Sequence, residues 1–179
     1  MPRRVPLLVA LSGLAAVAAL PSTAAAADAA DSVRARFTKY EYRIPMRDGV
    51  KLFTAVYVPK DAGGSKRYPI LLNRTPYGAS QDEKGFARAL ASSYAALAQD
   101  GYIFAFQDIR GRAKSEGQFV MLRPVRDKND PKAVDESTDT HDTVAWLLRA
   151  TKNNGRVGVL GVSYDGWLTV TAMLDPHPA

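Results

Sequence analysis

Residues 156–170, RVGVLGVSYDGWLTV, decide the fold because they read as a strand, a sharp bend at a serine, and a helix. The apolar run before the serine is typical of a strand buried on both faces of a parallel sheet. A bend between strand and helix lifts Ser163 above the sheet edge and aims the next backbone N–H at the same point. Gly161 and Gly166 keep bulk out of the place where strand and helix pack closely. The stretch therefore predicts a nucleophile elbow with Ser163 at its tip.

Three interpretations of Ser163 stay open on this stretch alone. Serine is favoured at helix N-caps, so Ser163 could do no more than cap the following helix. The spacing of Gly161, Ser163 and Gly166 also matches a dinucleotide-binding fingerprint with its middle glycine replaced, although a serine side chain obstructs the approach of a pyrophosphate there. The third interpretation is a catalytic nucleophile. The general G-x-S-x-G pattern then expects glycine where this chain has Asp165.

The segments before the elbow alternate between strand and helix patterns. Two extended runs flank Asp48-Gly49, a dipeptide that favours a tight hairpin turn. The second run alternates, which predicts one face with Leu52, Thr54, Val56 and Val58 and another with Lys51, Phe53, Ala55 and Tyr57. Further on, the patterns predict buried strands at 70–73, 102–109 and 156–161, helices at about 85–99 and 139–149, and a turn at 153–155. This order predicts an α/β fold with an antiparallel hairpin, then parallel strands with crossover helices.

Residues 1–27 have the layout of a cleaved secretory signal peptide. Arg3 and Arg4 precede an uncharged apolar run, and an alanine-rich cleavage region follows Pro21. The apolar run of ~16 residues is shorter than the ~20 needed to span a bilayer, which disfavours a membrane anchor. We therefore expect a periplasmic or secreted protein, with no membrane contact after cleavage. Residues 28–38 are expected to form a disordered lead-in, and 39–179 the folded domain.

Composition excludes several kinds of site and partner. The chain has no cysteine, which rules out disulfides, thiolate nucleophiles and cysteine metal sites. It has two histidines, too few for a multi-histidine zinc site. The formal charge is +6, but the basic residues are scattered rather than clustered, so no nucleic acid partner is expected. The acidic loop at 127–130 lacks the later glycine and glutamate of a calcium loop, so it is expected to be a solvated loop rather than a calcium site.

Six blocks of sequence, in order, resemble one protein family. They are 46–52 (MRDGVKL), 73–77 (NRTPY), 101–117 (GYIFAFQDIRGRAKSEG), 135–148 (DESTDTHDTVAWLL), 154–167 (NGRVGVLGVSYDGW) and 175–179 (DPHPA). Together they resemble the N-terminal part of the X-prolyl dipeptidyl-peptidase / cocaine-esterase family of α/β-hydrolases, and within it most closely the α-amino acid ester hydrolases. In this family the elbow is G-x-S-Y-x-G, which accommodates Asp165. The resemblance implies that 39–179 form the N-terminal part of an α/β-hydrolase domain, incomplete at the C-terminus.

The resemblance also implies roles for individual residues. Ser163 matches the family nucleophile, and the backbone N–H of Tyr164 matches one donor of the oxyanion hole. The hydroxyl of Tyr77 matches the second donor, and a phenol is a suitable fixed donor on a loop after a buried strand. Asp108 and Arg110 are expected to be scaffold that pairs with each other or with loop backbone. The resemblance implies no cofactor-binding residue and no metal ligand.

The acid and base of the family triad follow the serine in the chain, and neither is found here. About 12 helical residues place His177 ~18 Å from Ser163, far beyond hydrogen-bond reach. His141 precedes the serine, outside the family order. We therefore expect the N-terminal piece of a longer hydrolase, inactive by itself.

The reaction implied for the whole protein is hydrolysis of small-molecule acyl esters or amides through an acyl-enzyme. The resemblance favours α-amino acid esters or related β-lactam side chains as substrates. An X-prolyl dipeptidyl-peptidase, and an inactive truncated fragment or binding module, remain as alternatives. A homo-oligomer of the full-length enzyme is left open as a further partner.

Overall fold

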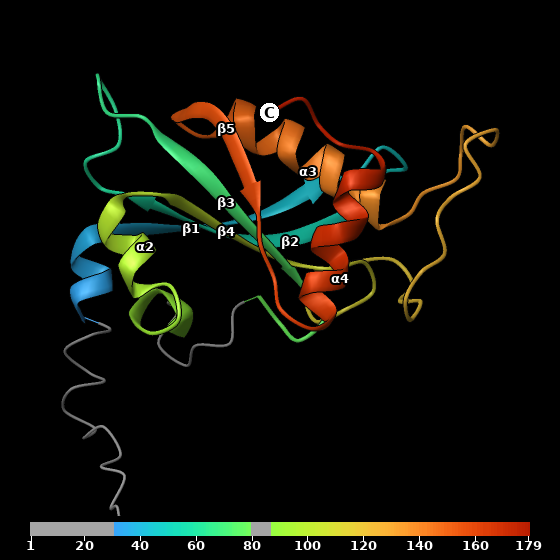
Figure 1. The fold of residues 1–179 in the computed structure, drawn as a ribbon, viewed down its shortest axis with the longest axis horizontal. Helices are drawn as coiled ribbons and strands as arrows, with labels where there is room; N and C mark the ends of the chain where they lie inside the picture. Colours follow the sequence, from blue (N-terminus) through green and yellow to red (C-terminus); the bar gives the residue numbers. More distant parts are fainter. Residues whose placement is uncertain (1–30, 80–86) are drawn as a thin grey trace, which may run out of the picture.

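The computed structural model describes residues 31–79 and 87–179 (Figure 1). The expected signal peptide lies outside the described residues, as does the beginning of the helix expected at 85–99. The described strands are β1 (Phe37–Pro45), β2 (Lys51–Pro59), β3 (Tyr68–Thr75), β4 (Ile103–Asp108) and β5 (Asn153–Val159). The helices are η1 (Arg88–Ala91), α2 (Ala95–Asp100), α3 (Glu136–Ala150), α4 (Tyr164–Thr171) and η2 (Ala172–Leu174).

The five strands form one mixed sheet in the order β1-β2-β4-β3-β5. β1 pairs antiparallel with β2, and β2 pairs antiparallel with β4. β3 is parallel to both of its neighbours, β4 and β5. The expected sequence of an antiparallel hairpin followed by parallel strands is therefore confirmed.

The hairpin at Asp48-Gly49 is confirmed, with a turn one residue longer than the tightest type. The N–H of Met46 donates to the carbonyl of Val50 at 2.8 Å, and the N–H of Gly49 donates to the carbonyl of Met46 at 2.9 Å. Gly49 has a φ of +86°, the left-handed conformation that three-residue hairpin loops need at this position.

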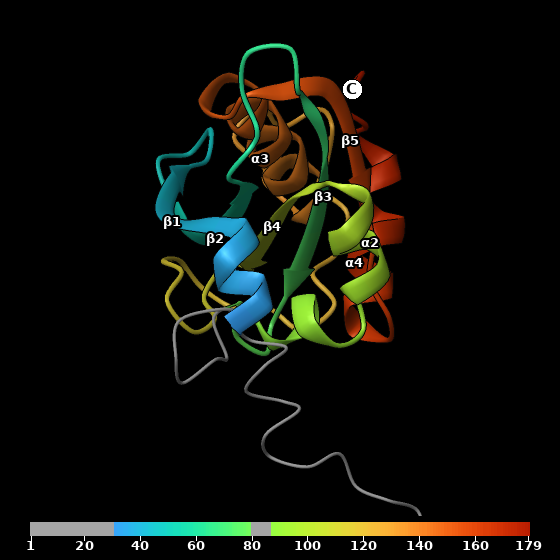
Figure 2. The same cartoon turned by 90° about the vertical axis from the view of Figure 1, so that its left-hand side faces the viewer.

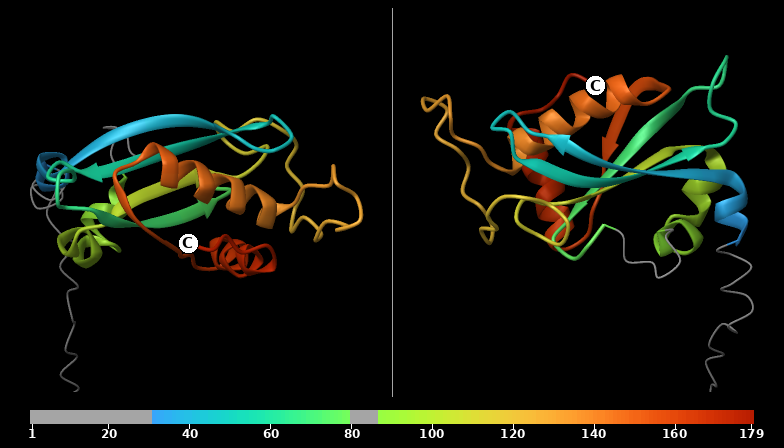
Figure 3. Two further views of the ribbon diagram at one scale, coloured as in Figure 1. Left: turned by 90° about the horizontal axis from the view of Figure 1, so that it is seen from above. Right: turned by 180° about the vertical axis from the view of Figure 1, so that it is seen from behind.

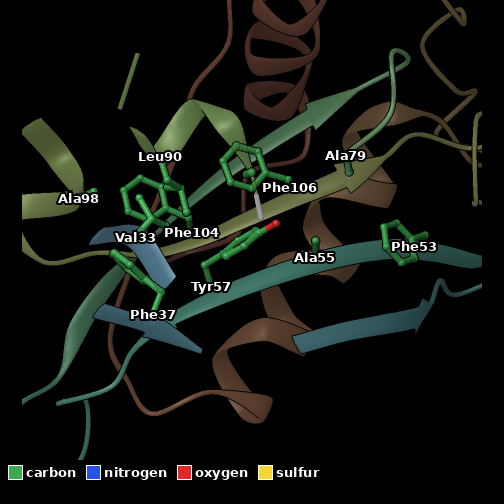
Figure 4. Packing of buried hydrophobic residues seen from close by; sticks show 11 residues of the cluster. Val33, Phe37, Phe53, Ala55, Tyr57, Ala79, Leu90, Ala98, Phe104 and Phe106 are labelled. Carbon is green, nitrogen blue, oxygen red and sulfur yellow. The ribbon is translucent and has the colours of Figure 1, made fainter. Parts of the chain in front are cut away.

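The two faces of β2 pack into separate cores, as its alternation predicts. Phe53, Ala55 and Tyr57 join Phe104 and Phe106 of β4 in one apolar cluster (Figure 4). On the other face, the cluster includes residues from β1, β2, β3, β4 and α3, with Leu52, Val56, Ile70, Leu72, Val144 and Leu147 among them. Helices must therefore cover both faces of this sheet.

Figures 1 and 2 show how the helices cover these faces. Residues 31–36 are helical and lie beside α2, where the Arg36 guanidinium donates to the carbonyl of Ala98 at 2.5 Å. In Figure 3, α3 and α4 lie on the same side of the sheet. Among the described residues, no helix has both the length and the apolar character that a membrane crossing requires.

The prediction of a disordered lead-in at 28–38 is wrong for the residues that the structure describes. Residues 31–36 form a helix, and β1 already starts at Phe37. Val33 and Phe37 are buried in the same cluster as α2. Val33 in this helix and Phe37 at the start of β1 give the segment two apolar side chains to bury, which composition alone did not reveal.

Two helix predictions need correction. α3 begins at Glu136, three residues before the expected start, because Asp135 and Thr138 form a reciprocal capping box. The helix expected at 85–99 is instead η1 and α2, separated by a turn at 92–94 that begins with Ser92. There the backbone leaves helical geometry, and the Ser92 hydroxyl donates to the carbonyl of Arg88 at 3.1 Å. Serine competes in this way with helical backbone bonding.

β5 is less buried than a central strand, contrary to expectation. Its residues are half-buried or exposed because β5 stands at the end of the described strand order and pairs along one edge with β3. The turn expected at 153–155 is accommodated within the strand. Asn153 pairs with Tyr68, the register then shifts, and Val157 pairs with Ile70.

Candidate active site

The loops after three parallel strands meet at one edge of the sheet. Thr75 at the end of β3 pairs with Asp108 at the end of β4, and the N–H of Leu160, just after β5, donates to the carbonyl of Leu72 at 3.0 Å. α2, which follows β3, packs with the cluster that contains Phe104 and Phe106, whereas α4, which follows β5, contacts α3 on the other face. Such a switch point at the carboxyl edge of a parallel sheet is where α/β proteins bind ligands. The loops carrying Tyr77 and Ser163 flank it.

Ser163 has a backbone conformation that L-amino acids rarely adopt. Its φ is +59° and its ψ is −124°, at the junction between the end of β5 and the start of α4. Strain of this kind costs about 1–3 kcal/mol and persists only where the surroundings enforce it. The Ser163 side chain is exposed and makes no capping hydrogen bond to α4. The plain N-cap interpretation requires such a bond and does not describe this geometry.

Gly161 allows the chain to turn this tightly. A Cβ atom built on Gly161 would lie 2.3 Å from the backbone carbon and oxygen of Asp165. Backbone atoms cannot move away as a flexible side chain can, so only glycine fits. A Cβ on Gly166 would lie 3.3 Å from the carbonyl of Gly161, a tight but less severe approach. The two glycines therefore hold strand and helix together on either side of Ser163.

Asp165, which stands where the general elbow pattern expects glycine, is hydrogen-bonded to a side chain of β3. The Asn73 side-chain amide donates to the carbonyl of Leu160 at 3.1 Å and to Asp165 Oδ2 at 3.3 Å. Asp165 Oδ1 is buried without a hydrogen-bond partner. Burial raises the pKa of Asp165, although hydrogen bonds from Asn73 and Thr75 act to lower it. The carboxyl therefore ties the elbow to β3, a role that no sequence pattern indicated.

Tyr164 presents its backbone and its side chain to different neighbours. Its N–H is the first of α4, a position without a partner inside the helix, so it is available to an external acceptor. Its phenol oxygen accepts a hydrogen bond from the N–H of Leu122 at 3.0 Å. Its ring packs against Trp167 with 5.3 Å between centroids. The side chain thus links the elbow helix to the long connection between β4 and α3.

Tyr77 lies on the loop after β3, with 61% of its surface exposed. Its N–H donates to Thr75 Oγ1 at 3.2 Å. The residue before it is held by Arg112, whose Nε donates to the Pro76 carbonyl at 3.0 Å. Tyr77 and Ser163 therefore lie on loops that follow neighbouring strands, at the same edge of the sheet.

The scaffold role expected for Asp108 and Arg110 is confirmed in part. Asp108 binds loop backbone, accepting from the N–H groups of Ala79 at 2.5 Å and Lys114 at 3.0 Å. The alternative pairing of Asp108 with Arg110 does not occur. The Arg110 guanidinium instead bridges Asp48 and Asp139, at 2.6 and 2.7 Å. Burial acts to lower the pKa of Arg110, but its hydrogen bonds to the two carboxylates raise it overall.

Sequence reasoning missed a buried arginine, Arg74, that connects the elements next to this edge of the sheet. Arg74 is 1% exposed, and its Nε donates to Gln107 Oε1 at 2.7 Å. Its Nη1 donates to the Glu136 carbonyl, and its Nη2 lies 3.1 Å from Glu136 Oε2. Burial raises the pKa of Glu136, while Arg74 acts to lower it. This network joins β3, β4 and the start of α3.

The two histidines lie together, with His141 on α3 and His177 after the end of α4 that is remote from Ser163. Their rings are 5.0 Å apart between centroids, and both line a cavity of about 300 Å³ bordered by α3, β5 and the residues after α4. Burial lowers the pKa of His177, and nearby His141 and Arg149 add to the effect. Within residues 31–79 and 87–179, no group of three or more side chains could hold a metal ion.

Comparison with known proteins gives consistent matches. The profile described as X-Pro dipeptidyl-peptidase (S15 family) matches residues 48–179. Cocaine esterase from Rhodococcus sp. (strain MB1 Bresler) is 39% identical over 124 residues, which cover 69% of this chain and 19% of that protein.

Two solved structures are similar in both fold and sequence. An aminopeptidase from the marine sediment archaeon Thaumarchaeota archaeon superimposes with a TM-score of 0.72 and 37% identity, covering 80% of this chain and 24% of that one. An α-amino acid ester hydrolase labelled with selenomethionine gives a TM-score of 0.71 and 43% identity, with the same coverage of 80% and 24%. The chain thus spans between about a fifth and a quarter of the length of these relatives.

Proposed function

This chain belongs to the X-Pro dipeptidyl-peptidase (S15) family, and from that premise we propose that it carries the nucleophile and oxyanion hole of a serine hydrolase. Ser163 attacks the carbonyl carbon of an ester or amide. The N–H of Tyr164 and the hydroxyl of Tyr77 stabilise the oxyanion of the tetrahedral intermediate. Loss of the alcohol or amine gives an acyl-enzyme, which water then hydrolyses.

One observation carries the proposal. Ser163 is an exposed serine with a strained backbone at a strand-to-helix junction, and its side chain does not cap the helix. Strain of this kind persists only where the rest of the structure enforces it, and it is concentrated at functional sites. The same bend leaves the N–H of Tyr164 without a helical partner, next to the hydroxyl that would attack.

The proton must be accepted by a group other than the two histidines described above. His177 follows the far end of α4, and His141 on α3 lies beside it, whereas a base must come within about 3 Å of the serine hydroxyl. We therefore place the triad acid and base elsewhere in the whole protein. These residues supply attack and charge stabilisation, and the reaction requires no metal ion or organic cofactor.

The substrate class favoured here is α-amino acid esters or related β-lactam side chains. It is supported by the 43% identity to an α-amino acid ester hydrolase over 80% of this chain. An X-prolyl dipeptidyl-peptidase is the second candidate, supported by the description of the matching family. The two candidate specificities differ in whether the enzyme recognises a free α-amino group on the acyl residue or a penultimate proline.

A direct comparison of substrates separates these candidates. The whole protein should be assayed with an α-amino acid p-nitrophenyl ester, its N-acetylated counterpart, and an Xaa-Pro-p-nitroanilide. We expect the free amino acid ester to have the highest kcat/KM. Faster cleavage of the Xaa-Pro-anilide would assign the second candidate. If none of the three is cleaved, the hydrolase proposal fails and a binding module remains.

A further inference from the structure

The motif QDIRGRAKSEG at 107–117 has no part in the proposed chemistry, yet it lies beside the site. β4 ends at Asp108 next to the end of β3 at Thr75, so the loops after the two strands leave the sheet side by side. The N–H of Ile109 donates to the Thr75 carbonyl at 3.1 Å. Any group at the end of β4 can therefore influence where the Tyr77 loop runs.

Two side chains of the motif hold the backbone on both sides of Tyr77. Arg112 Nε binds the carbonyl of Pro76, one residue before Tyr77, at 3.0 Å. Asp108 Oδ1 accepts from the N–H of Ala79, two residues after it, at 2.5 Å. These contacts fix the backbone just before and just after the tyrosine.

Asp108 is well suited to fix a loop rather than to contact a substrate. It is 1% exposed, and its other oxygen, Oδ2, accepts from the N–H of Lys114 at 3.0 Å. A buried carboxylate is stable only when hydrogen bonds replace its lost hydration, and hydrogen bonds to a charged acceptor are stronger than neutral ones. The loop after β4 is held in addition by Ser115, whose hydroxyl donates to the Asp108 carbonyl at 2.6 Å.

Tyr77 benefits from such support because it lies at the surface of the protein. With 61% of the residue exposed, packing cannot alone fix where the ring points. An oxyanion donor acts only when it lies about 2.7–3.1 Å from the developing charge. Its backbone must therefore be rigid for the hydroxyl to be in place.

We propose that Asp108 and Arg112 are positioning residues that set the place of the Tyr77 hydroxyl in the oxyanion hole. The inference rests on the proposed function, in which Tyr77 is an oxyanion donor. Asp108→Asn replaces one acceptor oxygen by an amide, which cannot accept from both loop N–H groups. Arg112→Met removes the bond to Pro76 at an exposed position, where a folding defect is not expected.

A double-mutant cycle with Tyr77→Phe in the whole protein tests this role. Asp108→Asn and Arg112→Met should each lower kcat by about 10- to 100-fold, as small misplacements at active sites do. KM should change by less than about 3-fold, since the contacts act on the transition state. In the Tyr77→Phe background, either substitution should cause no further loss. Lys114→Met, on the same loop, alters neither held contact and should retain the wild-type rate.

The inference is overturned if Asp108→Asn and Arg112→Met slow the Tyr77→Phe enzyme as much as the wild type, because both would then act independently of the phenol. Wild-type kcat in both single variants also overturns it, as does a wild-type rate for Tyr77→Phe. Covalent labelling of Ser163 by a fluorophosphonate separates these outcomes from a failure of the proposed function. With labelling intact, only the positioning role is lost.

Discussion

At the scale of single residues, the main feature is a conflict at Ser163. Its backbone conformation is unfavourable for serine, whereas the proposed reaction needs the serine hydroxyl at this position. A φ of +59° with a ψ of −124° is disfavoured for any residue with a Cβ atom and accessible to glycine. The protein keeps serine at this position although its side chain caps nothing. We interpret the strain as the consequence of presenting a hydroxyl at the edge of the sheet.

This conflict predicts how substitutions at Ser163 separate stability from turnover. Ser163→Ala should abolish turnover in the whole protein and leave the melting temperature within a few degrees, because the strained backbone remains. Ser163→Gly should also be inactive, but it should be more stable than Ser163→Ala by about 1 kcal/mol, since glycine relieves the strain. Thermal unfolding and ester hydrolysis measure both. A Ser163→Ala enzyme that still turns over would remove the nucleophile assignment.

Asp165 provides a pH-dependent test at the same scale. Its pKa is raised above the ordinary value of 3.8 by burial, so the folded state binds the proton more tightly than the unfolded state does. Stability from this group is therefore lost as pH rises from about 3.8 through the raised pKa. Asp165→Asn removes the ionisation and keeps the shape, so it should be more stable than the wild type at pH 7.

The difference between Asp165→Asn and the wild type should vanish near pH 3, where the wild-type carboxyl is protonated in both states. Denaturant unfolding at the two pH values measures it. An Asp165→Asn protein less stable than the wild type at pH 7 would show that the charged carboxylate is stabilising, contrary to the burial argument.

At the scale of elements, the active-site edge rests on a buried charge network rather than on apolar packing alone. Arg74 connects β3 to β4 through Gln107 and to the start of α3 through Glu136. Removing one partner of a buried ion pair leaves the other charged without compensation, which typically costs 3–5 kcal/mol. The edge of the sheet that carries Tyr77 is therefore sensitive to substitutions in this buried network.

Arg74→Met should consequently lower the free energy of unfolding by about 3–5 kcal/mol. Lys66→Met is the matched control, because it removes the cation of the exposed pair between Lys66 and Asp61. Exposed pairs contribute little, so this variant should keep the wild-type melting temperature. Equal destabilisation by the two substitutions would mean that burial of the Arg74 network is not the reason for its importance.

The elements that sequence predicted correctly are those with a local signal. Alternation in β2 revealed both of its faces, and the apolar runs located β3 and β4. The start of α3 was missed because its capping box uses aspartate and threonine, Asp135 and Thr138, rather than the usual serine or threonine with glutamate. Nothing local marks Arg74 as buried, since its partners are 33 to 66 residues away. Long-range pairing of this kind is a property of the fold.

At the scale of the whole molecule, strand order places the proposed catalytic groups. Because β3 lies between β4 and β5, the end of β4 at Asp108 and the loops that carry Tyr77 and Ser163 lie next to each other at one edge. The resemblance identified Ser163 and Tyr77, but the contacts that fix their loops became visible only in three dimensions. The chain spans between about a fifth and a quarter of the length of its relatives and carries the proposed nucleophile and oxyanion donors.

Export of the protein is proposed from the first residues alone and can be tested separately. N-terminal sequencing of protein recovered from the periplasm or culture medium should begin close to residue 27. An exported protein that still begins with the Arg3-Arg4 segment would contradict cleavage of a signal peptide.

The central claim, that Ser163 is the nucleophile, is tested most directly by covalent labelling. The whole protein would be treated with a fluorophosphonate, and its intact mass and proteolytic peptides measured by mass spectrometry, with Ser163→Ala as control. We predict one adduct per chain, on the peptide that contains Ser163, and no adduct on the variant. An adduct on a different residue, or an unlabelled Ser163 in a preparation that hydrolyses esters, would contradict the account.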